Sequence, residues 1–200
     1  IGQDSFTRKE VRWLNHAQVG RVDTPVTLGP LALMNLNGHH DLIGSLTFRG
    51  GSVQNSGTAT LGLLQTITAR VATATATING GRLAIARGQR NFHAEDGAPG
   101  PDLSITATIV DSGGITKSGP GTLLLNAPNS FQGAVAINAG VVHILNNTSL
   151  GTTGAGTTVA DGATLQIESV GALAEPLNSI QGAGHGGTLG VLNLMGATGV

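Results

Sequence analysis

The fold of this chain is decided by a short pattern that is clearest in Ile-Asn-Gly-Gly-Arg-Leu, residues 78–83. The pattern is an apolar residue, two variable residues, a glycine, one variable residue and a second apolar residue. It recurs as FRGGSV (48–53), VDSGGI (110–115), INAGVV (137–142) and, with one extra residue, VADGATL (159–165). Each segment is marked by a glycine: Gly51, Gly81, Gly113, Gly140 and Gly162. Steps of roughly 22–32 residues between them predict the successive turns of a repeat protein with variable loops.

The residues around each glycine alternate between apolar and small or polar types with a period of two. Examples are Leu46–Phe48, Leu83–Ile85, Val135–Ile137 and Leu165–Ile167. This alternation predicts half-buried β-strands, separated by turns rich in Gly, Asn, Asp and Ser. Glycine suits the corners because the chain must bend there at backbone angles that a Cβ atom would obstruct.

Two all-β architectures could bury such strands. A sandwich or barrel pairs consecutive strands antiparallel through hairpins. A parallel β-helix instead pairs each strand with its equivalent one turn later, so that like residues stack and each turn covers its neighbour. The recurrence of the glycine pattern favours the second arrangement. We expect a parallel β-helix of roughly 7–9 rungs, with adjacent rungs ~4.8 Å apart.

The composition excludes several classes of protein. With 32 glycines and only 10 % charged residues, the chain does not have the makeup of a helical bundle. Its many β-branched residues and net charge of −1 argue against disorder. The absence of cysteine excludes disulfides and thiolate metal sites. Scattered arginines without tyrosine predict no nucleic-acid binding, and no apolar run is long enough to predict membrane insertion.

The most specific stretch is GITKSGPGTLLL (114–125), which continues as NAPNSFQG (126–133) and VAINAGVV (135–142). It resembles the passenger-associated, or autotransporter-associated, β-strand repeat, with Phe131 in place of a tyrosine and Val142 in place of a leucine. The flanking stretch 43–51 is similar to a neighbouring rung of such proteins. The resemblance implies a right-handed parallel β-helix exported to the bacterial surface. It brings no catalytic residues with it.

On this basis three parts are expected along the chain. Residues 1–42 form N-terminal rungs that match the repeat weakly, residues 43–167 form β-helix repeats that match it well, and residues 168–200 continue the rungs. Ile1 is not a natural start and Val200 ends a strand-like pattern, so the chain is interpreted as a fragment of a longer protein. The absence of a visible export signal therefore says nothing about export.

The richest candidate for chemistry is the Gly- and Pro-rich loop 93–102, HAEDGAPGPD. Its carboxylates Glu95, Asp96 and Asp102 are weak candidates for a cation-binding loop, because oxygen ligands suit calcium. A pair of them could also serve acid and base roles in glycoside hydrolysis. A plain solvated loop is the preferred interpretation, so no catalytic, cofactor or metal site is assigned.

Other polar residues receive structural interpretations. The run His39-His40-Asp41 has metal-ligand residue types, but adjacent strand residues point to opposite faces, so a solvated corner is expected. His143 is interpreted as an outward strand residue. The spacing around Lys117 does not fit a phosphate-binding loop, and the family pattern implies that this lysine is a corner residue.

The leading functional hypothesis is a structural stalk or fibre segment of a large secreted or cell-surface bacterial protein, either adhesive or self-assembling. It involves no catalysis and no cofactor in this segment. The expected partners are other copies of the chain, a host or matrix surface, or a polysaccharide. The alternative hypothesis is a β-helix that binds or cleaves polysaccharide through loop 93–102.

Overall fold

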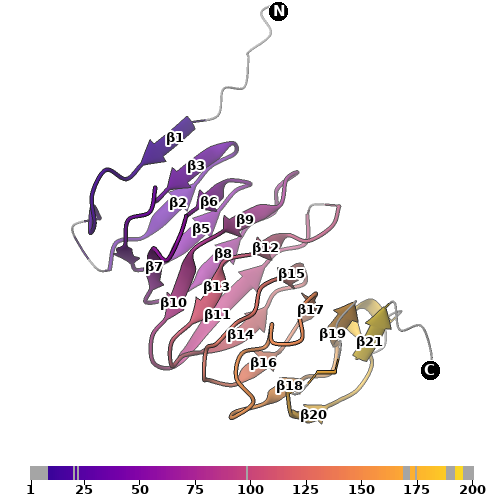
Figure 1. Cartoon of the computed structure of the whole chain (residues 1–200). Coiled ribbons are helices and arrows are strands. Elements are labelled where there is room, and N and C mark those ends of the chain that lie inside the picture. The colour runs from indigo at the N-terminus through magenta and orange to yellow at the C-terminus, as the bar shows by residue number, and fades with distance from the viewer. Residues whose placement is uncertain are drawn as a thin grey trace, which may run out of the picture.

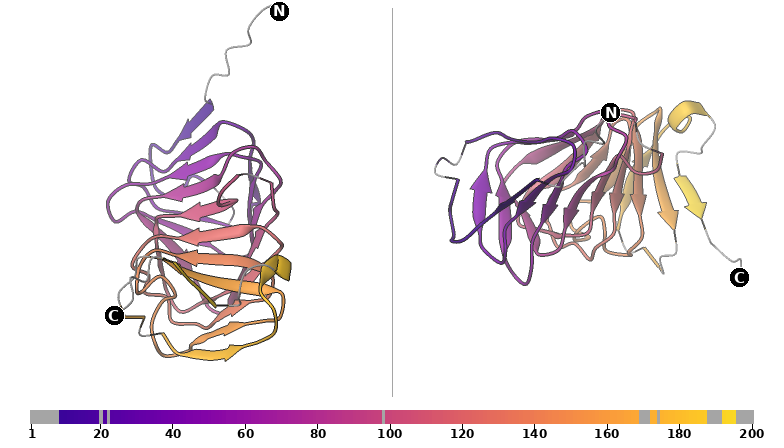
Figure 2. Two further views of the ribbon diagram at one scale, coloured as in Figure 1. Left: turned by 90° about the vertical axis from the view of Figure 1, so that its right-hand side faces the viewer. Right: turned by 90° about the horizontal axis from the view of Figure 1, so that it is seen from above.

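The computed structural model describes residues 9–19, 21, 23–97, 99–168, 172–173, 175–187 and 192–195. Within them the chain winds into a solenoid of parallel strands, which stack in chain order from β1 (Lys9–Arg12) at one end to β21 (Leu192–Met195) at the other (Figures 1 and 2). All strand pairs are parallel, and each joins a strand to its counterpart one coil away. The predicted β-helix, with about eight turns, is therefore confirmed. Antiparallel hairpins, as in a sandwich, do not occur among the described residues.

Three sheets run along the solenoid. In order along the stack, sheet A contains β1, β3 (Ala32–Asn35), β6 (Ser52–Gln54), β9 (Ala76–Asn79), β12 (Leu103–Ile105), β15 (Thr122–Leu125), β17 (Gly140–Ile144), β19 (Ala163–Glu168) and β21. Sheet B contains β2 (Val26–Leu28), β5 (Leu46–Phe48), β8 (Ile67–Ala69), β11 (Gln89–Ala94), β14 (Gly114–Ser118), β16 (Val135–Ile137), β18 (Thr157–Val159) and β20 (Leu177–Ile180). Sheet C contains β4 (Asp41–Ile43), β7 (Thr60–Leu63), β10 (Arg82–Ile85) and β13 (Thr108–Val110). A short 3-10 turn, η1 (His185–Gly187), lies near the end of the chain.

The core is a set of aliphatic columns that run through the solenoid. In sheet A, successive coils place these side chains over one another: Met34, Val53, Ile78, Ile105, Leu125, Ile144 and Ile167. All seven are buried, because the period-two alternation turns every second side chain inward. At about 25 cal/mol per Å² of apolar surface removed from water, such columns supply the main force that holds the coils together.

The coil length differs from most steps of the glycine pattern. One coil leads from Met34 to Val53 and a later one from Ile78 to Ile105, both shorter than the step from Gly51 to Gly81. The early glycine steps were therefore wrong as a measure of one turn. The reason is that these glycines mark different corners: Gly51 precedes a strand of sheet A, Gly81 one of sheet C and Gly113 one of sheet B. Every corner needs a sharp bend, so one local pattern serves all three.

The corner that leads from sheet B to sheet A varies most in length. It takes three residues at 29–31 and at 49–51, six at 70–75 and eight at 95–102, then returns to three at 119–121. The loops 70–75 and 95–102 lie on adjacent coils and project beyond the short corners on either side of them. No helix in the described part of the chain has the length and apolarity needed to cross a bilayer.

Candidate functional site

The unequal corner loops create a groove of about 660 Å³ on the outside of the solenoid. Three successive coils line it: Pro30 and Leu31 on the first, Arg49 and Gly50 on the second and residues 71–74 on the third, so the first and third form its walls. We call this set of residues the corner groove. Because two short loops are followed by a longer one, the longer loop projects beyond its neighbours, and the groove lies beside this projection.

The corner groove combines apolar walls with one cation. Leu31 is 46 % exposed and Val71 is 64 % exposed, and these two large aliphatic residues lie on the same groove. The Arg49 side chain is exposed, and no salt bridge in the described part of the chain includes it. Exposed apolar side chains gathered beside a charge are more typical of a contact surface than of inert rod.

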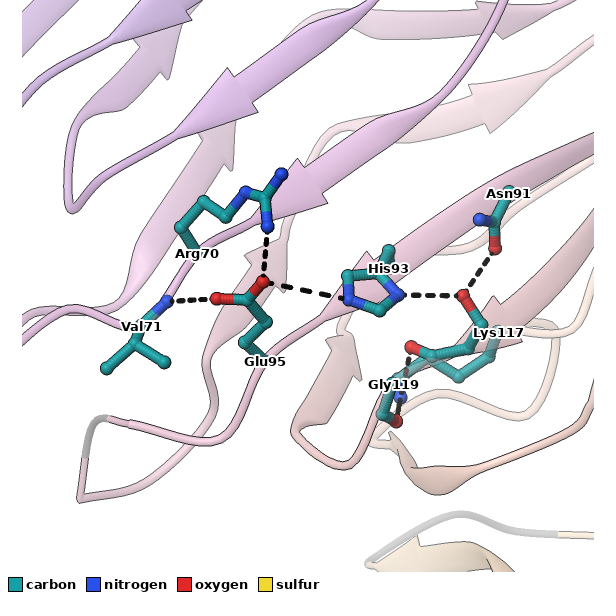
Figure 3. A network of polar contacts seen from close by, with 8 residues as sticks. Arg70, Val71, Asn91, His93, Glu95, Lys117 and Gly119 are labelled. Atoms are coloured by element: carbon teal, nitrogen blue, oxygen red, sulfur yellow. Dashed lines mark hydrogen bonds and ion pairs between the residues drawn. The ribbon is translucent and has the colours of Figure 1, made fainter.

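Glu95, one of the predicted candidates, fixes the groove in place. Its carboxylate accepts a hydrogen bond from the Val71 backbone N–H at 2.9 Å and pairs with Arg70 Nη1 at 2.6 Å (Figure 3). Both hydrogen bonds lower the pKa of Glu95 below its ordinary value, and the one from Val71 has the larger effect. The ionised carboxylate thus ties the second long loop to the first, and the wall formed by residues 71–74 is held before any ligand arrives.

Asp102, the second candidate, lies buried at the base of its loop. Its Oδ1 accepts the Gly97 N–H at 2.9 Å and its Oδ2 accepts the Thr122 N–H at 2.8 Å. Asp96, the third candidate, is exposed. Glu95 and Asp102 thus bind separate protein donors, and Asp96 faces solvent. In the described ranges, no three or more His, Cys, Asp or Glu side chains lie close enough together to hold a metal ion. The cation hypothesis stays a prediction, for which Glu95 and Asp102 would have to give up protein donors.

His93 lies beside Glu95 (Figure 3), and Ser118 lies on the other side of its ring, an order that superficially matches a hydrolase triad. His93 Nδ1 is 3.0 Å from Ser118 Oγ, and His93 Nε2 is 4.0 Å from Glu95 Oε1. However, Ser118 Oγ donates to Asn91 Oδ1 at 2.7 Å. A hydroxyl that gives its proton to an amide is not activated by the imidazole, and Glu95 is already occupied by Arg70. The arrangement therefore links strands β11 and β14 of adjacent coils through polar contacts.

Lys117 has a role that the sequence did not reveal. It lies in strand β14 and in a core column, between Phe92 and Ile137 of the neighbouring coils, with no exposed surface. Its ammonium donates to the carbonyls of Ser118, Gly119 and Ala139 at 3.0, 2.7 and 3.0 Å. Burial lowers the pKa of Lys117 to about 8, and Asp102 opposes that shift. The family-based expectation of a corner residue is therefore wrong: Lys117 lies within β14, and only its ammonium reaches the adjacent corner, where it binds the carbonyl groups from inside.

The other polar candidates are also bound by the protein. Asp41 stands in the core column of sheet C, where the next coil has Leu61, and its Oδ2 accepts hydrogen bonds from Trp13 Nε1 and from Val19 N. His143 Nε2 lies 2.8 Å from Glu168 Oε2 of the adjacent coil. Sequence reasoning missed the partnership of Asp41 with Trp13, since the two are far apart in the chain and no local pattern joins them.

The chain is similar to known proteins of the autotransporter passenger type, which agrees with its β-helix fold. The passenger-associated-transport-repeat family matches residues 115–144, the segment that supplies Lys117 and its corner. The chain is similar to the adhesin BmaC autotransporter of Brucella suis biovar 1 (strain 1330), with 35 % identity over 123 residues. That match covers 56 % of this chain but only 4 % of the relative, so the chain spans a small part of that protein. No solved structure matches it significantly.

Proposed function

From the autotransporter passenger repeat that this chain carries at residues 115–144, we propose that it is a rigid surface segment that adheres to other molecules through its corner groove. Support comes from the similarity to a protein named as an adhesin autotransporter and from the groove itself. The proposal places the segment outside the bacterial cell and assigns it no reaction.

The observation that carries the proposal is a preformed apolar groove that also presents a cation. Val71 and Leu31 are exposed on opposite walls, and Arg49 lies between them. Glu95 fixes the loop of Val71, so little ordering entropy is lost when a ligand enters. An occupant that matches these features has an apolar side chain next to a carboxylate, as in a peptide that contains Leu followed by Asp.

A polysaccharide is a poorer occupant of this groove. Sugar rings are usually held against exposed aromatic faces, and the described aromatic residues Trp13, Phe48, Phe92 and Phe131 are all buried. The acids that cleavage would require, Glu95 and Asp102, accept hydrogen bonds from the protein. The alternative function receives no support from these features, and the peptide is preferred.

The groove can be tested with two synthetic peptides, one containing Leu-Asp and the other Leu-Lys, titrated into the 15N-labelled chain. We expect the acidic peptide to shift the amide signals of Gly50 and residues 71–74, and the basic peptide to leave them in place. Arg49→Gln should weaken the acidic peptide about tenfold, the value of one charge-assisted contact. Equal shifts from both peptides, or shifts confined to other surfaces, would overturn the assignment.

Adhesion itself needs a second measurement. Cells that display the chain should be retained under flow on glass coated with the acidic peptide. A Val71→Asp variant, which places a carboxylate in the groove to repel that of the peptide, should lose that retention. Arg21→Gln is the matched control, because Arg21 is exposed and lies outside the groove. Retention that survives Val71→Asp would remove the groove from the adhesive role.

A further inference from the structure

Three histidine rings gather at the edge of sheet C, at the end of the solenoid that contains β1. His16 lies in the segment between β1 and β2, and His39 and His40 directly precede β4. The His16 and His40 rings are stacked, with centroids 5.0 Å apart, and His39 meets His16 edge-on at 4.9 Å. His16 and His40 are exposed, so protons from solvent reach both rings.

The two stacked rings replace carbonyl groups as acceptors for backbone N–H groups. The His40 N–H donates to His16 Nδ1 at 2.9 Å, and the Thr60 N–H donates to His40 Nδ1 at 3.0 Å. The ring of each coil thus accepts a hydrogen bond from the next coil, and the ladder of sheet C is extended by one residue before the start of β4. Both Nδ1 atoms must keep a lone pair for this, so each ring is neutral and carries its proton on Nε2.

The same hydrogen bonds keep His16 and His40 from binding a metal ion through Nδ1 while the cluster is intact. An imidazole binds a metal through an unprotonated nitrogen. In His16 and His40 that nitrogen is Nδ1, and it is already taken by the backbone.

The charged surroundings do not neutralise an added proton. Asp41 is the nearest carboxylate on β4, but its oxygens accept from Trp13, Val19 and Leu42, and no salt bridge joins it to a described histidine. Beyond Thr60 in the same column lies Arg82 of β10, a further cation. The neighbouring ring of His39 is itself titratable. A positive charge on His16 or His40 would therefore add to that of Arg82, with no free carboxylate on β4 to balance it.

We propose that His16 and His40 form an acid-sensitive latch that holds residues 13–19 onto the first coils. When either ring takes up a second proton, its Nδ1–H faces a backbone N–H, and an attractive contact becomes a repulsive one. Two charged stacked rings also repel each other. Histidine is the side chain that ordinarily changes charge between pH 5 and 8, so mild acid opens the latch. The segment then keeps the Asp41 bonds to Trp13 and Val19 and its backbone bonds from Trp13 N to Asn35 O and from Ala17 N to His40 O.

The latch makes a direct spectroscopic prediction. In the wild-type chain at pH 7.5, 15N chemical shifts should show His16 and His40 with unprotonated Nδ1 and protonated Nε2. On acidification to pH 5, hydrogen exchange of the His40 and Thr60 amides, corrected for the intrinsic pH effect, should accelerate about tenfold, the loss of one hydrogen bond. Protonated Nδ1 atoms at pH 7.5, or unchanged protection at pH 5, would refute the proposal.

Variants separate the latch from general acid effects. The double change His16→Gln and His40→Gln offers amide oxygens that accept hydrogen bonds but do not titrate, so amide protection and the fluorescence of Trp13 should no longer respond between pH 7.5 and 5. The control His39→Gln removes a ring that accepts neither bond, and its acid response should match the wild type. An acid response that persists in the double variant would also overturn the proposal. These outcomes do not depend on the corner groove, which lies at another corner.

Discussion

Replacement of Lys117 by Met tests whether a charge inside the aliphatic core stabilises the solenoid. Met keeps most of the buried aliphatic chain but removes the ammonium that donates to the Ser118, Gly119 and Ala139 carbonyls. The three carbonyls converge on one nitrogen within 3.0 Å, and Met supplies no donor in its place. The variant should fold into the same coils with a corner that is less tightly held.

The size of the effect follows from two opposing contributions. Each hydrogen bond from a charged group is worth about 1.5–3 kcal/mol. Burial of the ammonium offsets part of this: a pKa lowered from 10.5 to about 8 corresponds to about 3 kcal/mol. The three bonds outweigh that cost, and Lys117→Met should lose about 2–4 kcal/mol of unfolding free energy.

Guanidinium unfolding followed by circular dichroism measures this loss, with Lys9→Met as the control because Lys9 is exposed on β1. The dependence on pH gives a sharper test. Between about pH 8 and 10.5 the unfolded chain keeps a proton on Lys117 that the folded chain has lost, so wild-type stability rises with pH across this window. Met does not titrate, so the stability difference between wild type and Lys117→Met should widen. A difference below about 0.5 kcal/mol at pH 7, the size of an ordinary surface change, would refute the reasoning.

Three further changes probe other parts of the solenoid. Gly119→Ala should lower the free energy of unfolding by more than about 2 kcal/mol, because φ is +77° and the new Cβ would press on the Ala94 carbonyl oxygen. The control Gly57→Ala also has a positive φ but open space around it, so it should cost clearly less in the same thermal or chemical unfolding experiment. Phe131→Ala should cost about 3–5 kcal/mol, since the ring is fully buried. Burial raises the pKa of Glu175, so the stability of the wild type relative to Glu175→Gln should fall as pH rises through that pKa, which the difference between their thermal midpoints from pH 4 to 7 measures.

The strands and their inward faces could be predicted from sequence because both depend on neighbouring residues. The alternation at Leu46–Phe48 and Val135–Ile137 reports directly which side chains face the core, and the structure buries the outer residues of each. Coil length could not be predicted in the same way. It depends on which corner each glycine occupies, and Gly51, Gly81 and Gly113 look alike locally while they serve different corners.

In the candidate site, too, features that depend on neighbouring residues could be predicted from the sequence, and contacts between coils could not. The composition of loop 93–102 pointed to Glu95, and the structure places that residue against the corner groove. The partners of Glu95 and Lys117 could not be predicted from the sequence, because Arg70 and Ala139 belong to neighbouring coils and are distant in the chain. Such contacts exist only once the register between coils is set, and register follows from packing of the whole column rather than from any short motif.

Beyond β13 the third side of each coil no longer contributes a strand to sheet C. It is held instead by individual bonds, such as Asn129 Nδ2 to the Ser149 carbonyl and Ser149 Oγ to the Leu125 carbonyl. Sheets A and B therefore keep their registry without a continuous ladder on that side. The exposed turn around residues 152–154 is accordingly a natural graft point, where foreign sequence could be carried while the rod keeps its pitch.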